Sequence, residues 1–371
     1  MTDPLELVTV LARDLVRIDS RSFLSNLAIA EAVEAALSGF TIERIDYADA
    51  AGVAKRVLAA RRGGGTGGLA LAGHMDTVPD TGWPDDPWSG RLEGGLLHGL
   101  GSTDMKGPLV ACIVAARSLP DRVPVTLLIT TDEETTKQGA SQLAERSVLV
   151  REAKPAAIVV AEPTLMRPLR GHRSFIHFIV TATGVQAHSS TGRGRNANWD
   201  LVEFLVEMKT LSRRLREDVS LQDADYDPPF SDFNPIIDNH GAAINVTVPK
   251  ATVRIKYRYT AKTNTAPVVQ AVREAAARAG LTLTMERDGF PPELPVDHPL
   301  IRRCVALTGE APLTAPYGTD AAELQAIAPC VVLGPGDIAE AHTPTEKVNV
   351  AALAAAVPVF MRLAEQVAAE G

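Results

Sequence analysis

Leu69-Ala-Leu-Ala-Gly-His74 is the stretch that decides the fold, because it joins a short apolar, strand-like run to a side chain that can bind a metal. The association recurs along the chain and gives five candidate ligands: His74, Asp104, Glu134, Glu162 and His342. The first four are separated by 30, 30 and 28 residues, about the length of one strand–helix–strand unit. Successive units of an open α/β sheet deliver side chains to one crevice at the carboxyl ends of the strands. We therefore predict that two imidazoles and three carboxylates meet there around a cation.

Three regions of the chain differ in their pattern of strand-like and helical runs. Residues 1–170 alternate β-branched runs with Ala-rich helical stretches, which indicates an α/β domain with a mixed, mostly parallel sheet. Residues 171–286 have strand-like and helical runs separated by a polar, Pro- and Asp-rich stretch, 222–239, and predict a smaller α+β domain. Residues 287–371 again alternate strand-like and helical runs, as residues 1–170 do. Because the candidate ligands flank the insert on both sides, 1–170 and 287–371 are expected to form one domain, with 171–286 inserted in it.

Composition narrows the class of protein. The 37 basic and 45 acidic residues give a net charge of −8, which argues against nucleic acids and anionic membranes as partners. Three cysteines without paired spacing predict neither a disulfide framework nor a thiolate site. The first residues lack the pattern of a signal peptide, and we identify no apolar run of membrane-spanning length. We expect a cytoplasmic protein.

The motif His74-Met-Asp76 gives the first ligand a neighbour. A lone buried histidine is more often structural than a ligand. Metal-bound imidazoles, however, usually donate their second N–H to a carboxylate. Positions i and i+2 of an extended segment point the same way, so Asp76 is expected to orient His74.

The segment Gly99-Leu-Gly-Ser-Thr-Asp104-Met-Lys-Gly107 presents the second ligand. An ordinary turn would also contain Asp and Gly. Here an apolar helix led by Pro108 follows at once, and glycines allow the backbone to turn sharply. A carboxylate held at this position can bridge two cations.

Asp132-Glu133-Glu134 closes an apolar strand. Adjacent acids usually belong to a solvated turn, but these fall at the spacing of the ligands and are expected inside the crevice. Neighbouring acids can divide the chemistry, because one binds metal while the other takes a proton from metal-bound water.

Taken together, LAGHMDTVP, GLGSTDMKG, TTDEETTKQGA, VVAEPT and VLGPGDIAEAHTP resemble the M20 metallopeptidase family over nearly the whole chain. Within it, the resemblance is closest to acetylornithine deacetylases, beside succinyl-diaminopimelate desuccinylases. It implies two zinc ions, replaceable by cobalt or manganese, and a small-molecule substrate. It also implies that the insert is a lid or dimerisation domain of a homodimer.

The resemblance also implies a role for each candidate residue. One metal would bind His74, Asp104 and Glu162, and the other would bind Asp104, Glu134 and His342. Glu133 would be the general base and Asp76 the orienting residue. The catalytic and substrate-binding candidates beyond the ligands are His188, which would stabilise the oxyanion, and Asn245, Arg258, Gly318 and Thr319.

At positions other than the metal ligands, the sequence departs from the usual pattern of the family. Lys256-Tyr257-Arg258 stands where Asp-Ile-Arg is usual, and Thr319-Asp320 stands where Thr-Glu is usual. The expected reaction is therefore hydrolysis of an N-acyl amino acid by metal-activated water, as in N-acetylornithine deacetylation. A desuccinylase or an exopeptidase stays open as an alternative, as does a metal-binding protein without catalysis. The presence of Glu133 counts against the last.

Overall fold

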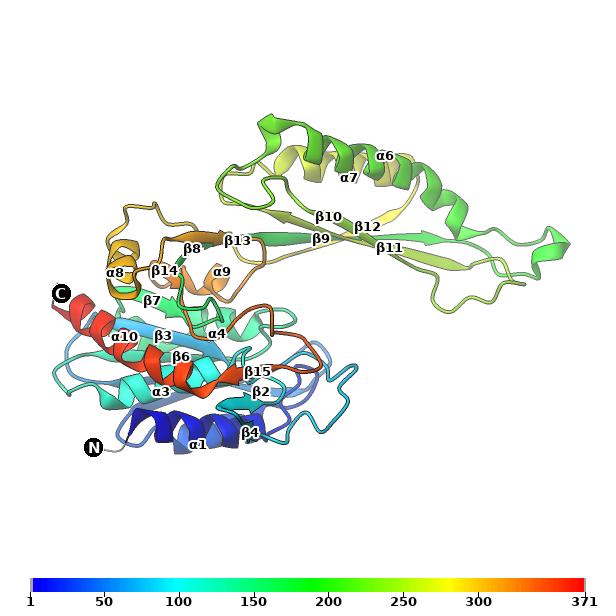
Figure 1. The fold of residues 1–371 in the computed structure, drawn as a ribbon. Coiled ribbons are helices and arrows are strands. Elements are labelled where there is room, and N and C mark those ends of the chain that lie inside the picture. Colours follow the sequence, from blue (N-terminus) through cyan, green and yellow to red (C-terminus); the bar gives the residue numbers. More distant parts are fainter. Residues whose placement is uncertain (1–2, 370–371) are drawn as a thin grey trace. The chain divides into compact units, whose positions relative to one another are not determined.

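The computed structural model describes residues 3–369 (Figure 1). The chain divides into two compact units. Unit 1 comprises Met1–Gly171, Pro292–Leu313 and Thr319–Gly371, and unit 2 comprises His172–Pro291 and Thr314–Gly318.

Unit 1 is built on an eight-stranded sheet in the order β1-β2-β6-β3-β7-β14-β8-β13. The bounds of these strands are β1 Thr41–Ala48, β2 Ala54–Arg62, β3 Leu69–His74, β6 Val125–Thr130, β7 Ala157–Val160, β8 Leu169–His172, β13 Leu313–Ala315 and β14 Cys330–Val332. The central neighbours β6, β3, β7 and β14 are parallel, whereas β1 pairs antiparallel with β2, β2 with β6, and β8 with β14. The expected mixed, mostly parallel α/β sheet is confirmed.

Helices cover both faces of this sheet (Figure 1). Their bounds are α1 Pro4–Val16, α2 Leu27–Ala35, α3 Lys106–Ser118, α4 Gln138–Arg146, α5 Val148–Ala153, α8 Pro299–Thr308, α9 Ala321–Leu324 and α10 Val350–Ala368. The main core lies on the face covered by α1, α3 and α10, where β3 contributes Leu69 and Leu71 and β6 contributes Leu127 and Ile129. These strands are buried on both faces and therefore read as continuous apolar runs.

The helix α10 has 19 residues and is apolar enough, by length and composition, to cross a membrane. The sequence reading overlooked this run. Its side chains Leu353, Phe360 and Leu363 are fully buried, and the helix packs against α1 and α3. Packing in the core of unit 1 accounts for its composition.

Two smaller groups of strands complete unit 1 and unit 2. In unit 1, β4 (Arg91–Glu93), β5 (Leu96–His98) and β15 (Lys347–Asn349) form a three-stranded sheet beside the loop that carries Asp104. In unit 2, a four-stranded antiparallel sheet has the order β10-β11-β9-β12. Unit 2 consists of β9 Ser174–Thr183, η1 Ser189–Thr191, α6 Ala197–Glu217, η2 Val219–Leu221, β10 Phe233–Asp238, β11 Lys250–Tyr259, α7 Ala266–Arg278 and β12 Thr282–Arg287.

Alternation of buried residues along β9 and β11 explains how unit 2 forms its own core. Ile176, Phe178 and Val180 of β9 point to the same face as Val253 and Ile255 of β11, and α6 and α7 pack against them. The strand β10 lies inside the polar, Pro- and Asp-rich stretch 222–239. As an edge strand it tolerates Pro235, which cannot donate a ladder hydrogen bond.

Candidate metal centre

Three of the candidate ligands meet at the carboxyl ends of β3 and β7 and the start of α3. His74 is the last residue of β3, Glu162 follows β7 by two residues, and Asp104 precedes α3 by two. His74 Nε2 lies 3.2 Å from Asp104 Oδ1 and 3.8 Å from Glu162 Oε1. All three side chains are buried, so they form a compact group of one imidazole and two carboxylates.

A second group shares Asp104 with the first. His342 Nε2 lies 3.2 Å from Asp104 Oδ2 and 3.0 Å from Glu134 Oε2. Glu134 follows β6, and His342 lies in the loop between β14 and β15. One oxygen of Asp104 thus faces His74 and the other faces His342, which is the geometry required of a carboxylate that bridges two cations.

Crowded carboxylates shift the pKa values in both groups. Burial, together with the charge of Asp104, raises the pKa of Glu134 to about 8 and that of Glu162 well above its usual range. Hydrogen bonds with Asp104 and Glu134 raise the pKa of His342 to about 11. Burial opposes ionisation of Asp104, but hydrogen bonds from His342 and His74 outweigh it and lower its pKa.

The donor set fits divalent cations. Each group offers one imidazole nitrogen and carboxylate oxygens, the ligand types of catalytic zinc sites, and its ligand atoms all lie within 4.8 Å of one another. A bound divalent cation would compensate the charges of these carboxylates.

The carboxylate of Asp76 contacts the backbone of Glu133 and Glu134 more closely than it contacts His74. Its carboxylate accepts hydrogen bonds from the backbone N–H groups of Glu133 (3.2 Å) and Glu134 (3.3 Å) and from the hydroxyl of Ser22 (2.7 Å). The Nδ1 atom of His74 lies 2.9 Å from the backbone oxygen of Asp76 and 3.5 Å from its Oδ1 atom. The tautomer of His74 is therefore set chiefly by a carbonyl group, a detail that spacing alone does not reveal.

Glu133 is buried beside the two groups. Its Oε1 atom makes no hydrogen bond with any described residue and lies 3.7 Å from the ammonium of Lys137. Burial raises the pKa of Glu133, although the charge of Lys137 opposes the shift. A buried carboxylate oxygen without a hydrogen bond suits a group that takes up and releases a proton.

A buried ion pair fixes the backbone that presents Glu133. Lys55 Nζ lies 2.8 Å from Asp132 Oδ1, and the hydroxyl of Tyr47 donates to Asp132 Oδ2 at 2.6 Å. Asp132 has a left-handed backbone with φ of 63°, and its carbonyl accepts the N–H groups of Thr136 and Lys137. The strands β1 and β2 thus position the turn in which the acids lie.

Glu346 holds the loop of Asp104. Its carboxylate accepts three backbone hydrogen bonds, from Gly101 at 3.1 Å, Thr103 at 2.8 Å and Asp104 at 3.0 Å. Burial raises its pKa to about 7, and those hydrogen bonds oppose the shift.

The part of the chain that matches known proteins includes all residues of the two groups. The model of the peptidase family M20/M25/M40 matches residues 70–366. An acetylornithine deacetylase from Myxococcus xanthus is 30% identical, with 98% of each chain covered. One from Proteus mirabilis is 32% identical over 84% of this chain and 82% of its own length. The chain belongs to the M20 peptidase family.

Solved structures show the M20 fold as well. The aminopeptidase PepT from Bacillus cereus aligns with a TM-score of 0.71 at 18% identity, covering 98% of this chain and 99% of its own. A family M20 metallo-carboxypeptidase from Sulfolobus solfataricus aligns over the full length of both chains, with a TM-score of 0.74 at 14% identity. Membership in M20 identifies a hydrolase of amide bonds that depends on a divalent metal.

The remaining candidates of this M20 chain lie outside the two groups. His188 is exposed in unit 2, where its Nδ1 atom lies 2.7 Å from the hydroxyl of Ser190, and the carbonyl of Asn245 accepts the N–H of Ser189. Arg258 forms an ion pair with Asp232 at 2.6 Å. Their part at the metal centre stays a prediction.

Gly318 belongs to unit 2, and the adjacent Thr319 is buried in unit 1. The next residue, Asp320, was not named among the substrate-binding candidates. The hydroxyl of Thr130 donates to its Oδ2 atom at 2.5 Å, and burial and the charge of Glu133 raise its pKa well above the usual range.

Proposed function

We propose that this M20 hydrolase removes the acyl group from an N-acyl amino acid, in the manner of an acetylornithine deacetylase, with two zinc ions. The observation that carries the proposal is that two groups of nitrogen and oxygen ligands share Asp104, and that Glu133 is buried beside them with an oxygen that accepts no hydrogen bond from a described residue. The curated relatives named acetylornithine deacetylase support the choice of substrate class.

Each residue of the site has a distinct part in this proposal. His74, Asp104 and Glu162 would hold one zinc, and Asp104, Glu134 and His342 the other. When bound, the pair supplies Lewis-acid polarisation of the acyl carbonyl and lowers the pKa of water. Glu133 removes a proton from the attacking water and delivers it to the leaving amine, and Asp76 holds the Glu133 backbone in place.

Four residues of unit 2 and Thr319 of unit 1 complete the proposal. His188 would donate a hydrogen bond to the oxygen that gains negative charge, and Asn245 and Arg258, with Gly318 and Thr319, would bind the substrate. A guanidinium fork suits a substrate carboxylate, once Arg258 exchanges Asp232 for it. We therefore propose that residues 172–291 act as a lid.

A panel of substrates tests the reaction. Zinc-loaded protein is expected to release free amine from N-acetylornithine faster than from N-succinyl-diaminopimelate, other N-acyl amino acids or dipeptides. A preference for N-succinyl-diaminopimelate or for dipeptides would replace the deacetylase by the desuccinylase or the exopeptidase. No hydrolysis of any substrate would favour a metal-binding protein without catalysis.

Replacing Glu133 tests the role of the base. Glu133→Ala is expected to lower turnover by about 10²- to 10⁴-fold, because proton transfer is lost while every ligand remains. Bound zinc, measured by atomic absorption, should be unchanged. The matched control is Glu152→Ala, which removes an exposed carboxylate of α5. Full turnover in Glu133→Ala would exclude the role.

Replacing His188 tests the oxyanion role. His188→Ala is expected to lower turnover by about 100- to 1,000-fold without altering the fold, as the loss of one oxyanion donor does elsewhere. His240→Ala, which removes another exposed histidine of unit 2, is the control. Equal turnover in the two variants would show that His188 is a turn residue without a part in the reaction.

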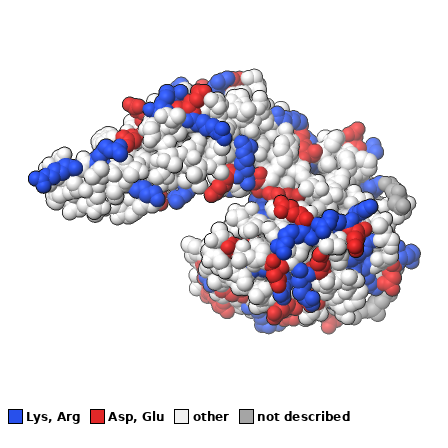
Figure 2. Space-filling view, turned by 180° about the vertical axis from the view of Figure 1, so that it is seen from behind, with Lys and Arg blue, Asp and Glu red and all other residues white. Residues whose placement is uncertain are grey.

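We also propose a cytoplasmic homodimer joined through unit 2. The α6 side chains Trp199, Val202 and Val206 are exposed at 74%, 46% and 60%, at a spacing that places them on one side of the helix. The edge strand β10 exposes Ile236 and Ile237. Figure 2 shows broad uncharged areas on unit 2 between its charged side chains. Large apolar side chains exposed along one side of a helix support a protein interface there.

A further inference from the structure

The lysine at the start of α4 breaks the local preferences of a helix start. Lys137 is the N-cap residue, with a left-handed backbone at φ of 54° and no capping hydrogen bond from its side chain. Ser, Thr, Asp, Asn and Gly are the residue types that favour an N-cap. A cation there meets the positive end of the helix dipole, and a left-handed backbone is uncommon for any residue other than glycine. Natural sequences break such preferences mainly at functional or strained sites.

The side chain of Lys137 is also buried, with only 7% of it exposed. Burial of an ammonium is unfavourable unless an opposite charge lies close to it. The backbone N–H of Lys137 donates to the carbonyl of Asp132 at 2.7 Å, and its own carbonyl accepts the N–H of Ser141 at 3.2 Å. The turn after β6 and the first turn of α4 therefore fix the point from which the ammonium extends.

The ammonium of Lys137 lies beside the carboxylate of Glu133. Lys137 Nζ is 3.7 Å from Glu133 Oε1, and this oxygen makes no hydrogen bond with any described residue. Asp76 holds Glu133 through its backbone N–H, whereas Lys137 forms an ion pair with the carboxylate itself. The charge of Lys137 therefore bears directly on where the carboxylate of Glu133 lies.

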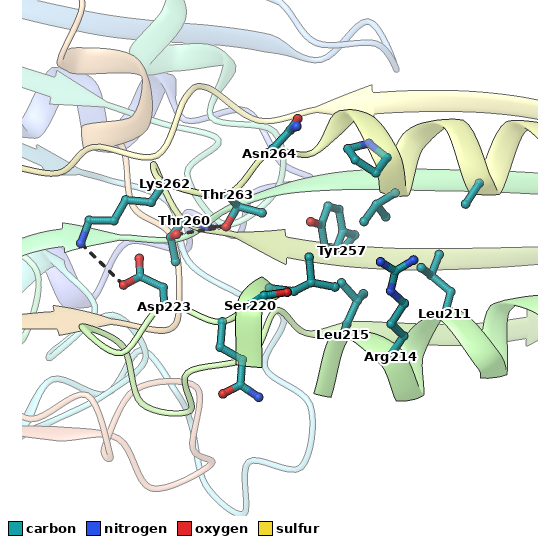
Figure 3. A pocket seen from close by; sticks show the side chains of 15 residues that line it. Leu211, Arg214, Leu215, Ser220, Asp223, Tyr257, Thr260, Lys262, Thr263 and Asn264 are labelled. Atoms are coloured by element: carbon teal, nitrogen blue, oxygen red, sulfur yellow. Dashed lines mark hydrogen bonds and ion pairs between the residues drawn. The ribbon is translucent and has the colours of Figure 1, made fainter. Parts of the chain in front are cut away.

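An ion pair of similar length in unit 2 shows why burial matters. In the pocket of Figure 3, Lys262 Nζ lies 3.6 Å from Asp223 Oδ1, but 54% of the lysine side chain is exposed. Water screens an exposed pair of this kind, and its contribution is small. The pair of Lys137 and Glu133 is buried, so its charges act on each other much more strongly.

A second buried carboxylate, that of Asp320, is under the influence of the same ammonium. The hydroxyl of Thr130 donates to Asp320 Oδ2, and Asp320 Oδ1 makes no hydrogen bond with any described residue. The charge of Glu133 contributes to the raised pKa of Asp320, and the charge of Lys137 opposes the shift. Lys137 is therefore a cation close to two buried carboxylates, and it reduces the repulsion between them.

We propose that Lys137 is a positioning residue for the hydrolysis, which holds the carboxylate of Glu133 through Oε1 and screens it from Asp320. The other oxygen, Oε2, is then left to take the proton of the attacking water. Lys137 acts through Glu133 and contacts neither the metals nor the substrate. This inference rests on the proposed function, in which Glu133 is the general base.

Steady-state kinetics of zinc-loaded protein test the role, with the substrate that the wild type hydrolyses fastest. Lys137→Met removes the charge and keeps an unbranched side chain. We expect kcat to fall by about 10- to 100-fold, because displacement of a catalytic group by a fraction of a bond length has effects of this size. KM and bound zinc should match the wild type, since neither the substrate nor a ligand loses a contact. Lys137→Arg restores a cation and should recover most of kcat.

The matched control is Lys154→Met. Lys154 also has a left-handed backbone, with φ of 49°, but it is exposed at the end of α5. The control therefore removes the same charge from the same backbone conformation, and its kcat should equal that of the wild type. Circular dichroism verifies that each variant is folded. Lys137→Gln, which is also neutral, takes the place of Lys137→Met if the latter does not fold.

A double-mutant cycle shows whether Lys137 acts through Glu133. In a Glu133→Ala protein the carboxylate that Lys137 holds is gone. Adding Lys137→Met to that protein should therefore cause no further loss of kcat. Additive losses would show that Lys137 acts by a route that does not include Glu133, and would overturn the proposal.

The remaining outcomes separate this proposal from the proposed function. Full kcat in folded Lys137→Met, beside an inactive Glu133→Ala, would refute the positioning role alone. So would a change confined to KM, or a loss of bound zinc. Full turnover in Glu133→Ala, or no hydrolysis by the wild type, would refute the proposed function and with it the role of Lys137.

Discussion

At the scale of single residues, Glu346 shows how one carboxylate positions another. It accepts three N–H groups of the segment that presents Asp104. In Glu346→Gln, an NH₂ group replaces one of the two accepting oxygens and meets a backbone donor. We expect the affinity for zinc to fall by about 10- to 100-fold, as it does when partners of metal ligands are lost elsewhere.

Competition with a chromophoric chelator measures that affinity. The control is Glu340→Gln in the same loop, where the replaced carboxylate forms a more exposed ion pair with Lys347. Equal zinc affinity in the two variants would show that Glu346 does not position Asp104.

The sequence allowed some of these residues to be found and not others. The five candidate ligands could be identified because each follows a strand or precedes a helix, the first four at a regular stride, and the structure gathers them in two groups. Glu346 could not, because it contacts Gly101 across 245 positions of chain and nothing in its local pattern indicates that partner. Lys55 was missed because its partner Asp132 is also distant in the sequence and because lysines in strands are usually exposed.

At the scale of elements, the buried pair of Lys55 and Asp132 ties β2 to the turn after β6. Lys55→Met is expected to lower the free energy of unfolding by about 3–5 kcal/mol, because Asp132 would keep a buried charge without its cation. Urea titration followed by circular dichroism measures the change.

Two further variants check the cause of that loss. Lys209→Met, which removes an exposed lysine of α6, should leave the free energy of unfolding within about 0.5 kcal/mol of wild type. The double change Lys55→Met with Asp132→Asn removes both charges and should recover part of the stability. A stable single Lys55→Met variant would contradict this account of the turn.

Elements differ in how well their patterns predict them. The run 267–280, opened by proline and closed by glycine, indicates a helix, and α7 spans Ala266–Arg278 with Gly280 at φ of 65°. The strand β10 escaped because it is short, lies at an edge and contains Pro235. β10 is a strand because it forms backbone hydrogen bonds with β11. The local sequence of β10 does not indicate which strand it pairs with.

At the scale of the whole molecule, the exposed stripe of α6 predicts the oligomeric state. The double variant Trp199→Asp with Val206→Asp is expected to convert a dimer to a monomer, because charged groups in the centre of an interface leave unpaired charges buried. Light scattering coupled to size exclusion measures the mass. Val148→Asp, an exposed change on α5 of unit 1, is the control. A wild type that is already monomeric would refute the dimer.

Removal of metal is expected to affect the stability of the whole of unit 1. Chelator-treated protein should melt at a lower temperature than zinc-loaded protein, because a ligand that binds only the folded state at 100 times its Kd stabilises it by about 2.7 kcal/mol. Calorimetry at fixed protein concentration gives the difference. The variant Asp104→Asn, with a neutral group at the bridging position, should show a smaller response to chelator.

The division of unit 1 between the beginning and the end of the chain has a consequence for its biosynthesis. Residues 172–291 leave the ribosome as an almost complete unit, whereas the sheet of unit 1 still lacks β14 and its core lacks α10. Domains generally fold as units during synthesis. A nascent chain arrested at residue 320 is therefore expected to resist protease over residues 172–291 while its first 170 residues are digested. His342 and Glu346 follow unit 2 in the sequence, so we expect the metal centre to be complete only after residues 172–291 have left the ribosome.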